Sequence, residues 1–415
     1  MSVQAPGPRR GWQAALAVQS AASQAAWQGI RLMLAYQALA ETNSPAFVGI
    51  VSALIALAGL VVSIPSGRLL DRFGGAWVAL GGIVISLLGV IVVLVAHNIV
   101  GLLISSVLVG VGYIHVVVAQ QGTVARLSVG SSPDAAFGAL TSAVSIGQLI
   151  GPPVVTMAAI AVSNGGAHPN TWIGSAACGL LFLIAMPPFF MLRRSEQSVP
   201  IPQPATGEAV ASLRTVLRSP AILRALLVGA AVLVTVDLLS SFIPVWAVEH
   251  RIPADVVGWL LALRALFTIT SRIGAARLVA RFGRKALLIA SLSLGVLALL
   301  ALPFSGAWAA LPVMAALGLG LGLPQPLSLV WMSSLAPPHA RGAVFGARMT
   351  VNRFSQVTLP LLVATIAGPA GMFAVFWATA GILASSVVIV GVTPSRELNT
   401  TGADEEHDQG PDEIV

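Results

Sequence analysis

The stretch GRLLDRFGGA, residues Gly67–Ala76, decides the fold, and it lies between two long apolar runs. A related stretch, ARLVARFGRK, follows 209 residues later at Ala276–Lys285. Both copies keep an Arg-Leu pair and an Arg-Phe-Gly turn. They differ in that only the first carries an aspartate and only the second ends in two basic residues. A chain that repeats a short polar turn between apolar runs is predicted to consist of two similar halves.

Composition identifies the class of protein. Of 415 residues, 56% are hydrophobic and 9% are charged, and the mean hydropathy is +0.90. Soluble domains carry about 25% charged residues. Apolar runs near the roughly 20 residues needed to cross a bilayer recur along almost the whole chain. The sequence therefore predicts an all-α polytopic membrane protein.

Polar or Gly/Pro-rich breaks divide the apolar runs into twelve expected membrane spans. Their approximate limits are 15–40, 46–66, 77–96, 100–125, 137–162, 171–192, 221–248, 255–275, 286–304, 309–334, 343–367 and 372–392. The longest interior connection divides them six and six. We therefore expect an N-terminal six-helix bundle, a cytoplasmic linker, a C-terminal six-helix bundle and a disordered acidic cytoplasmic tail, at 1–192, 193–220, 221–393 and 394–415.

The basic residues indicate how the chain is oriented. Seventeen of the 22 Lys and Arg residues fall on the face that the termini share, and only Arg251 falls on the opposite face. Because cytoplasmic loops are enriched in basic residues, both termini are expected in the cytoplasm. This asymmetry also explains the net charge of +7 without any binding of nucleic acid. Arg outnumbers Lys 21 to 1, which is typical of a GC-rich bacterial genome and favours a bacterial inner membrane.

The two halves align at a nearly constant offset. Pairs at 209 include Val48-Gly49 with Val257-Gly258, and pairs at 208 include Gly110 with Gly318, Gly112 with Gly320, and Gln148 with Gln356. A parallel repeat of two six-helix halves is typical of one large group of secondary transporters, whose substrate site lies near the midplane between the halves.

With this repeat, the chain resembles the major facilitator superfamily over residues 15–392. The first polar stretch is similar to the family motif between helices two and three, roughly G-x-L-x-D-R-x-G-R-R. The matching residues are Gly67, Leu69, Asp71, Arg72 and Gly74 in the first copy, and Arg281 and Gly283 in the second. The resemblance implies that Asp71 meets the start of helix eleven, about 342–346, and latches the outward-facing state. A plain solvated Asp-Arg pair is the alternative.

A second motif, GQLIGPP at Gly147–Pro153, resembles the helix-five motif of the family's antiporters. Gly147, Gly151 and Pro152 match, whereas Val155 and Thr156 replace the motif's final glycines. The resemblance implies a bend that seals the cavity in exporters, and ordinary close packing of small residues is the alternative. The Arg that many proton-coupled exporters carry in span four is missing.

Polar residues at membrane depth are candidates for the transport site, because each ionisable group there costs roughly 2.5–3.5 kcal/mol on insertion scales. Asp237 is the only acid deep in any span. The resemblance implies that spans one, four, seven and ten line the cavity. The expected cavity residues are Gln24, Gln28, Arg31, His115, Asp237, Gln325 and Arg353. Asp237 and His115 are expected to carry protons, with a structural Arg31–Asp237 ion pair and a satisfied histidine as the alternatives.

Four deep arginines, Arg31, Arg264, Arg348 and Arg353, stand against that one acid. Guanidinium groups bind carboxylate and phosphate bidentately, which favours an anionic or zwitterionic organic substrate. We expect a monomeric secondary transporter that exports such a compound, or a drug-like one, in exchange for protons. Uptake of an organic anion by symport or facilitated diffusion, and a non-transporting sensor, are the alternatives. No enzyme activity, cofactor or metal site is expected, because the six histidines are scattered.

Overall fold

The computed structural model of the chain describes residues 11–128, 133–162, 168–198, 219–273, 275–335 and 341–399. Every regular element in these ranges is a helix. The N-terminal half contains α1 (Trp12–Thr42), α2 (Pro45–Phe73), α3 (Gly75–Val95), α4 (Ile99–Leu127), α5 (Pro133–Ile160), α6 (Thr171–Ile184) and α7 (Pro188–Glu196). The C-terminal half contains α9 (Pro220–Glu249), α10 (Ala254–Arg272), α11 (Ala275–Phe282), α12 (Arg284–Ala301), the short turn η1 (Leu302–Phe304), α13 (Ala310–Gly322), α14 (Pro324–Leu335), α15 (Arg341–Val392) and α16 (Ser395–Asn399).

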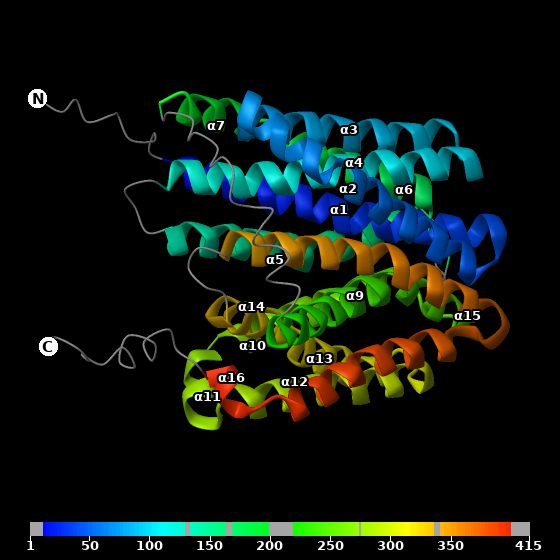
Figure 1. The fold of residues 1–415 in the computed structure, drawn as a ribbon. Coiled ribbons are helices and arrows are strands. Elements are labelled where there is room, and N and C mark those ends of the chain that lie inside the picture. Colours follow the sequence, from blue (N-terminus) through cyan, green and yellow to red (C-terminus); the bar gives the residue numbers. More distant parts are fainter. Residues whose placement is uncertain are drawn as a thin grey trace, which may run out of the picture.

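The long helices run roughly side by side, with the two halves of the chain as two adjoining bodies (Figure 1). Helix α1 begins, and α16 ends, at the same end of the bundle (Figure 1). An even number of crossings produces this arrangement. We call this the terminal end of the bundle, and the opposite one the far end.

Ten helices of the described chain are long and apolar enough to cross a membrane, and they correspond to ten of the expected spans. The remaining two expected spans are also helical. Helix α1 has a polar face that lowers its hydropathy, and α15 is assigned as 52 continuous helical residues. Figure 1 shows α15 reversing direction at the far end, so it accounts for both of the last two spans.

Prolines divide two of the expected spans. Span six is split into α6 and α7 before Pro188, and span ten is split into α13 and α14 before Pro324. Proline has no N–H for the helical ladder, and its ring clashes with the preceding turn. The helices also extend past the expected bundle boundaries: α7 continues to Glu196, and α16 lies where the disordered tail was expected to begin.

The repeated motif forms a helix end and a one-residue turn, where the sequence predicted a loop. Helix α2 continues to Phe73, and α3 begins at Gly75. The single residue between them, Gly74, has φ 81° and ψ 164°. Its repeat partner Gly283, between α11 and α12, has φ 78° and ψ 154°. Only glycine adopts this region at low cost, which explains why both copies keep it.

Close backbone contacts repeat as well. A Cβ at Gly110 of α4 would overlap the carbonyl oxygen of Ile55 on α2. A Cβ at Gly318 of α13 would overlap the carbonyl oxygen of Arg264 on α10 in the same way. The constant offset in the sequence therefore corresponds to the same helix contact made twice, and it gives Ile55 and Arg264 equivalent positions.

Among the described residues, the helix pairs that join the halves are α2 with α15, α5 with α10, α1 with α9 and α2 with α9. The contact of α5 with α10 lies toward the far end, where a Cβ at Gly258 of α10 would overlap the Thr156 hydroxyl of α5. The next nearest atoms belong to Pro153 and Pro152. These crossings bring polar residues of both halves together at the centre.

We expect Gly283→Ala to lower the apparent melting temperature of the purified protein, because alanine at this φ and ψ costs of order 1–3 kcal/mol. A Cβ at Gly283 meets no atom within 4 Å, so the loss would come from the backbone alone. Gly67→Ala is the matched control, since Gly67 also has open space and lies within a helix. Equal melting of the two variants would contradict the explanation.

Candidate functional site

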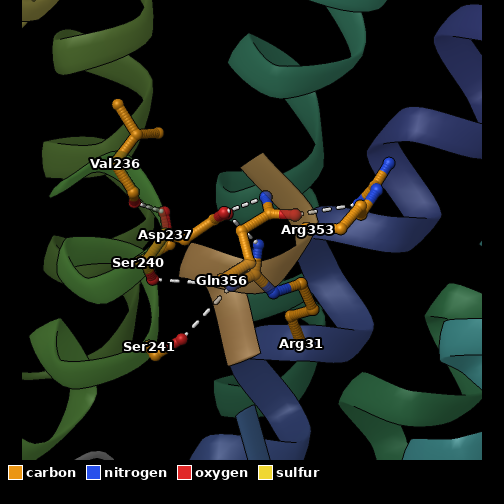
Figure 2. A network of polar contacts seen from close by, with 7 residues as sticks. All are labelled: Arg31, Val236, Asp237, Ser240, Ser241, Arg353 and Gln356. Carbon is orange, nitrogen blue, oxygen red and sulfur yellow. Dashed lines mark hydrogen bonds and ion pairs between the residues drawn. The ribbon is translucent and has the colours of Figure 1, made fainter. Parts of the chain in front are cut away.

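An ion pair joins the two halves of the chain (Figure 2). Arg31 of α1 donates from Nη1 to Oδ1 of Asp237 on α9 over 2.9 Å. Its Nη2 donates to the Ser241 hydroxyl over 3.2 Å and to the Asp237 carbonyl over 3.4 Å. The two charged side chains are only 13% and 18% exposed. The guanidinium therefore clamps one turn of α9 from the other half.

A third helix completes the network. Gln356 of α15 donates from Nε2 to the second carboxylate oxygen of Asp237. Arg353, one turn earlier, donates to Oε1 of Gln356 over 2.9 Å. Figure 2 shows Arg31 of α1 and Gln356 of α15 meeting the carboxylate of Asp237 on α9, with Arg353 bound to Gln356. Both oxygens of Asp237 are thus hydrogen-bonded, which compensates the cost of placing the charge away from water.

Two aromatic rings border this network. Trp27 of α1 stacks on Tyr113 of α4, with ring centroids 3.7 Å apart and planes 4° from parallel. The guanidinium carbon of Arg31 lies 5.4 Å from the Trp27 ring centroid. A cation at this distance is attracted by the ring face. The aromatic pair therefore helps to orient Arg31 toward Asp237.

A narrow pocket adjoins Arg31. Its polar lining comes from Gln28 and Arg31 of α1, Gln148 of α5, Ser240 of α9 and Arg264 of α10. Two leucines and Pro152 complete its wall. Arg264 is 4% exposed and has no hydrogen-bond partner in the described ranges. The pocket thus takes two helices from each half and contains two arginines.

The structure brings some of the predicted cavity residues together and leaves others apart. Arg31, Asp237 and Arg353 share the network, and Gln28 lines the pocket. His115 instead hydrogen-bonds through Nδ1 with the Val111 carbonyl at 2.8 Å, and its Cβ lies against Gly82 of α3. Gln325 accepts from Arg272 over 3.0 Å at the terminal end of α10. Gln24 packs against Gly147.

Sequence reasoning gave no cavity role to Gln356, Ser241, Gln148, Trp27 or Tyr113. One signal was available. Gln148 and Gln356 are repeat partners on α5 and α15, and each projects toward the centre from its own half. The aromatic pair and the serine carry no comparable signal, because nothing in one helix indicates what faces it. Within the described residues there is no group of His, Cys, Asp and Glu that could hold a metal ion.

The stretch GQLIGPP lies where α5 meets α1. Cβ atoms at Gly147 and Gly151 would overlap the backbone of α1 at Ala21 and Ala25. Pro152 lines the pocket, and its carbonyl accepts from the Thr156 hydroxyl over 2.9 Å. Thr156 itself faces α10. The two glycines therefore allow close packing within one half, while the following turn contacts the other half.

The expected latch falls partly outside the described residues. Asp71 is exposed and makes no hydrogen bond or ion pair with any side chain that the structure describes. Its expected partner, at about 342–346, lies within residues 341–347, where only the backbone of α15 is described. The latch therefore stays a prediction. Arg72 lies 5.1 Å from the ring centroid of Phe73, and Arg281 lies 5.3 Å from that of Phe282, so this local contact repeats.

The first copy lacks the two final basic residues for a visible reason. Glu196, at the end of α7, occupies the start of α3: its carboxylate accepts from the Ala76 N–H over 3.0 Å and from the Thr123 hydroxyl over 2.9 Å. Arg126 donates to the Glu196 carbonyl over 2.7 Å. A carboxylate is favoured at a helix N-terminus by the dipole and the free N–H groups.

In the second copy, basic side chains occupy the corresponding place. Lys285 donates to the carbonyls of Gly391 and Thr393 over 2.8 and 2.7 Å, and Arg284 donates to the Leu398 carbonyl. These carbonyls lie at the end of α15 and in α16, where the helical ladder leaves acceptors free. Each half thus joins its third helix to its last one, but with opposite charges.

Comparison with known proteins agrees with this architecture. The family model of the Major Facilitator Superfamily matches residues 16–253 and 225–411. The chain is therefore a member of the Major Facilitator Superfamily, and its fold is that of a secondary transporter. No curated protein gives a match to the chain.

Solved structures of the same fold include a peptide transporter POT in complex with sulfate, with TM-score 0.74 and 17% identity over 95% of this chain and 97% of that one. A POT family transporter in complex with 5-aminolevulinic acid has TM-score 0.75 and 15% identity, over 95% and 97% of the two chains. The nucleoside transporter NupG has TM-score 0.71 and 14% identity over 92% and 99%. At these identities the likeness establishes the fold.

We expect Arg31→Gln and Asp237→Asn each to destabilise the protein by roughly 2–4 kcal/mol, because each leaves a mostly buried charge without its partner. The double variant should lose less than the sum of the single losses, since neither charge then remains. Thermal melting of the four purified proteins measures this cycle. If the loss of stability in the double variant equalled the sum of the two single losses, the two side chains would not form a stabilising ion pair.

We expect Glu196→Ala to lower the melting temperature more than Glu196→Gln does. Glutamine retains an acceptor for the Ala76 N–H and can donate its own N–H to the Thr123 hydroxyl, so it loses mainly the charge–dipole attraction, about 0.3–1 kcal/mol. Alanine also leaves the buried Thr123 hydroxyl unpaired, which costs a further 1–3 kcal/mol or so. Equal melting of both variants with the wild type would show that this contact does not hold α7 in place.

Proposed function

We propose that the protein is a proton-coupled antiporter that exports a small anionic or zwitterionic organic compound across the cytoplasmic membrane by alternating access. The observation that carries the proposal is the Arg31–Asp237 pair, because it joins the two halves through one titratable group. Ionised Asp237 would bind the cationic group of a zwitterionic substrate, and a proton on Asp237 would displace that group. Proton and substrate would then occupy the carboxylate in turn, as exchange requires.

The environment of Asp237 supports a coupling role. Burial disfavours the charged form of a carboxylate, whereas a nearby Arg and hydrogen-bond donors favour it. These opposing effects act on Asp237 together, since Arg31 and Gln356 each donate to one of its oxygens. Displacement of either donor would make proton binding easier. A substrate cation at Asp237 would instead favour the charged form, so substrate and proton would compete for this carboxylate.

The direction of export rests on the antiporter-like stretch GQLIGPP and its contacts. Gly147 and Gly151 pack against α1, and Thr156 lies against Gly258 of α10 toward the far end of the bundle. A rigid seam there would seal the cavity on the side away from the termini. With both termini in the cytoplasm, the loaded cavity would then face inward, as an exporter requires.

Uptake by symport is the second candidate. Solved transporters of this fold bind sulfate and 5-aminolevulinic acid, which are anionic and zwitterionic ligands, and the arginines of this chain suit the same chemistry. His115 stays a candidate proton carrier in both schemes, and Asp71 a candidate latch. We place the protein in the bacterial inner membrane as a monomer.

We expect some member of a panel of anionic and zwitterionic compounds to dissipate a proton gradient in inverted vesicles that contain the protein, as read by a pH-sensitive dye. Asp237→Asn should abolish this response, because the amide cannot exchange a proton. Glu249→Gln, which removes an exposed acid from the end of the same helix, should respond like the wild type.

Either of two results would overturn parts of the proposal. A full response from Asp237→Asn would exclude that residue as the coupling group. Uptake of labelled organic anions by intact cells, with no response in the inverted vesicles, would replace export by symport.

A further inference from the structure

We infer that Arg264, Gln148 and Gln28 form the subsite that holds the carboxylate or phosphate group of the transported molecule. The subsite lies between α10 of the C-terminal half and α5 and α1 of the N-terminal half. The inference deepens the proposed transport function and rests on it. It assigns the anion to Arg264 and leaves the proton to Asp237.

Arg264 carries a buried charge with no hydrogen bond or ion pair to any residue that the structure describes. Its side chain is 4% exposed, its Nε is buried without a partner, and no hydrogen bond joins it to any residue of the described chain. An arginine in a protein stays protonated, so it has no neutral form in which to avoid the cost of burial. Such a charge is strongly destabilising until an anion pairs with it.

The scaffold does not require an arginine at this position. The backbone carbonyl oxygen of Arg264 lies in close contact with Gly318. The carbonyl oxygen of Ile55 lies in the same way against Gly110 in the other half. Ile55 is 6% exposed, so an apolar side chain satisfies the equivalent environment. The charge of Arg264 therefore serves something other than helix packing.

The neighbours of Arg264 have the chemistry of an anion site. The pocket lining contains amide and hydroxyl groups and no acid. Its other arginine, Arg31, is already paired with Asp237. Gln148 makes no hydrogen bond within the described ranges, whereas its repeat partner Gln356 is bound to Asp237. A free guanidinium beside free amides matches the planar, bidentate acceptor that a carboxylate presents.

The remaining wall is apolar, formed by Leu32, Leu261 and Pro152. It suits the hydrocarbon part of an organic anion. Because Arg264 belongs to one half and Gln148 to the other, an anion held by both would draw α10 and α5 together. Binding of an anion at this subsite would therefore affect the position of both halves of the chain.

The test uses the full-length protein in nanodiscs and follows melting by tryptophan fluorescence. The probes are acetate, benzoate and glutarate, each beside its uncharged amide, and inorganic phosphate, all at one ionic strength. We expect at least one of these anions to raise the melting temperature while the amides do not.

Arg264→Ile should weaken anion binding at least tenfold. Arg264→Lys should weaken it less, because lysine keeps the positive charge but lacks the two parallel N–H donors of a guanidinium. Arg194→Gln, which changes an exposed arginine, should bind like the wild type.

The ligand-free protein gives a second readout. Arg264→Ile should melt at or above the wild-type temperature, because it removes an unpaired charge and installs the residue of the repeat partner. A lower melting temperature would mean that Arg264 is structural and would overturn the inference. So would a failure of every anion to stabilise the wild type, or unchanged anion binding in Arg264→Ile.

Asp237→Asn separates this inference from the proposed function. We expect it to keep anion binding and to lose proton flux in vesicles. If Arg264→Ile binds anions normally while Asp237→Asn loses proton flux, the subsite is wrong and the coupling role stands. If Arg264→Ile loses anion binding while Asp237→Asn moves protons normally, the subsite stands and the coupling role is wrong.

Discussion

The low dielectric of the membrane interior makes an unpaired charge expensive, and this constraint governs the centre of the molecule. The fold answers it by giving Asp237 a donor for each carboxylate oxygen, Arg31 from one half and Gln356 from its own half. The Arg31–Asp237 pair thus lowers the cost of burying a charge and also joins the two halves of the chain. A change in the protonation or pairing of one side chain acts directly on the contact between the halves.

The sequence predicted the two-halved helical architecture because both of its causes are visible along one chain. Apolar runs of membrane length give the helices, and a constant spacing of glycines gives the repeated contacts, such as those at Gly110 and Gly318. The motif between helices two and three was less predictable in form. Its polar residues predicted a loop, yet α2 continues through them to Phe73 and ends at Gly74, which has a positive φ.

The site was predictable only in part. Arg31 and Asp237 could be found because charges at membrane depth are few. His115 and Gln325 share that polarity, but the structure places them against other partners, because the span that carries a residue does not fix the side toward which it points. The pocket beside Arg264 was equally hidden. Its significance appears only when the helix of the other half, with Gln148, is in place.

The one-residue turns at Gly74 and Gly283 have a mechanical consequence. A hairpin joined by a single residue has almost no slack, so α2 and α3 cannot slide or tilt independently, and the same holds for α11 and α12. Glu196 and Lys285 then tie each hairpin to the last helix of its own half. Each six-helix bundle therefore moves as a rigid body, and the rearrangement needed for transport takes place at the helix contacts between the two bundles.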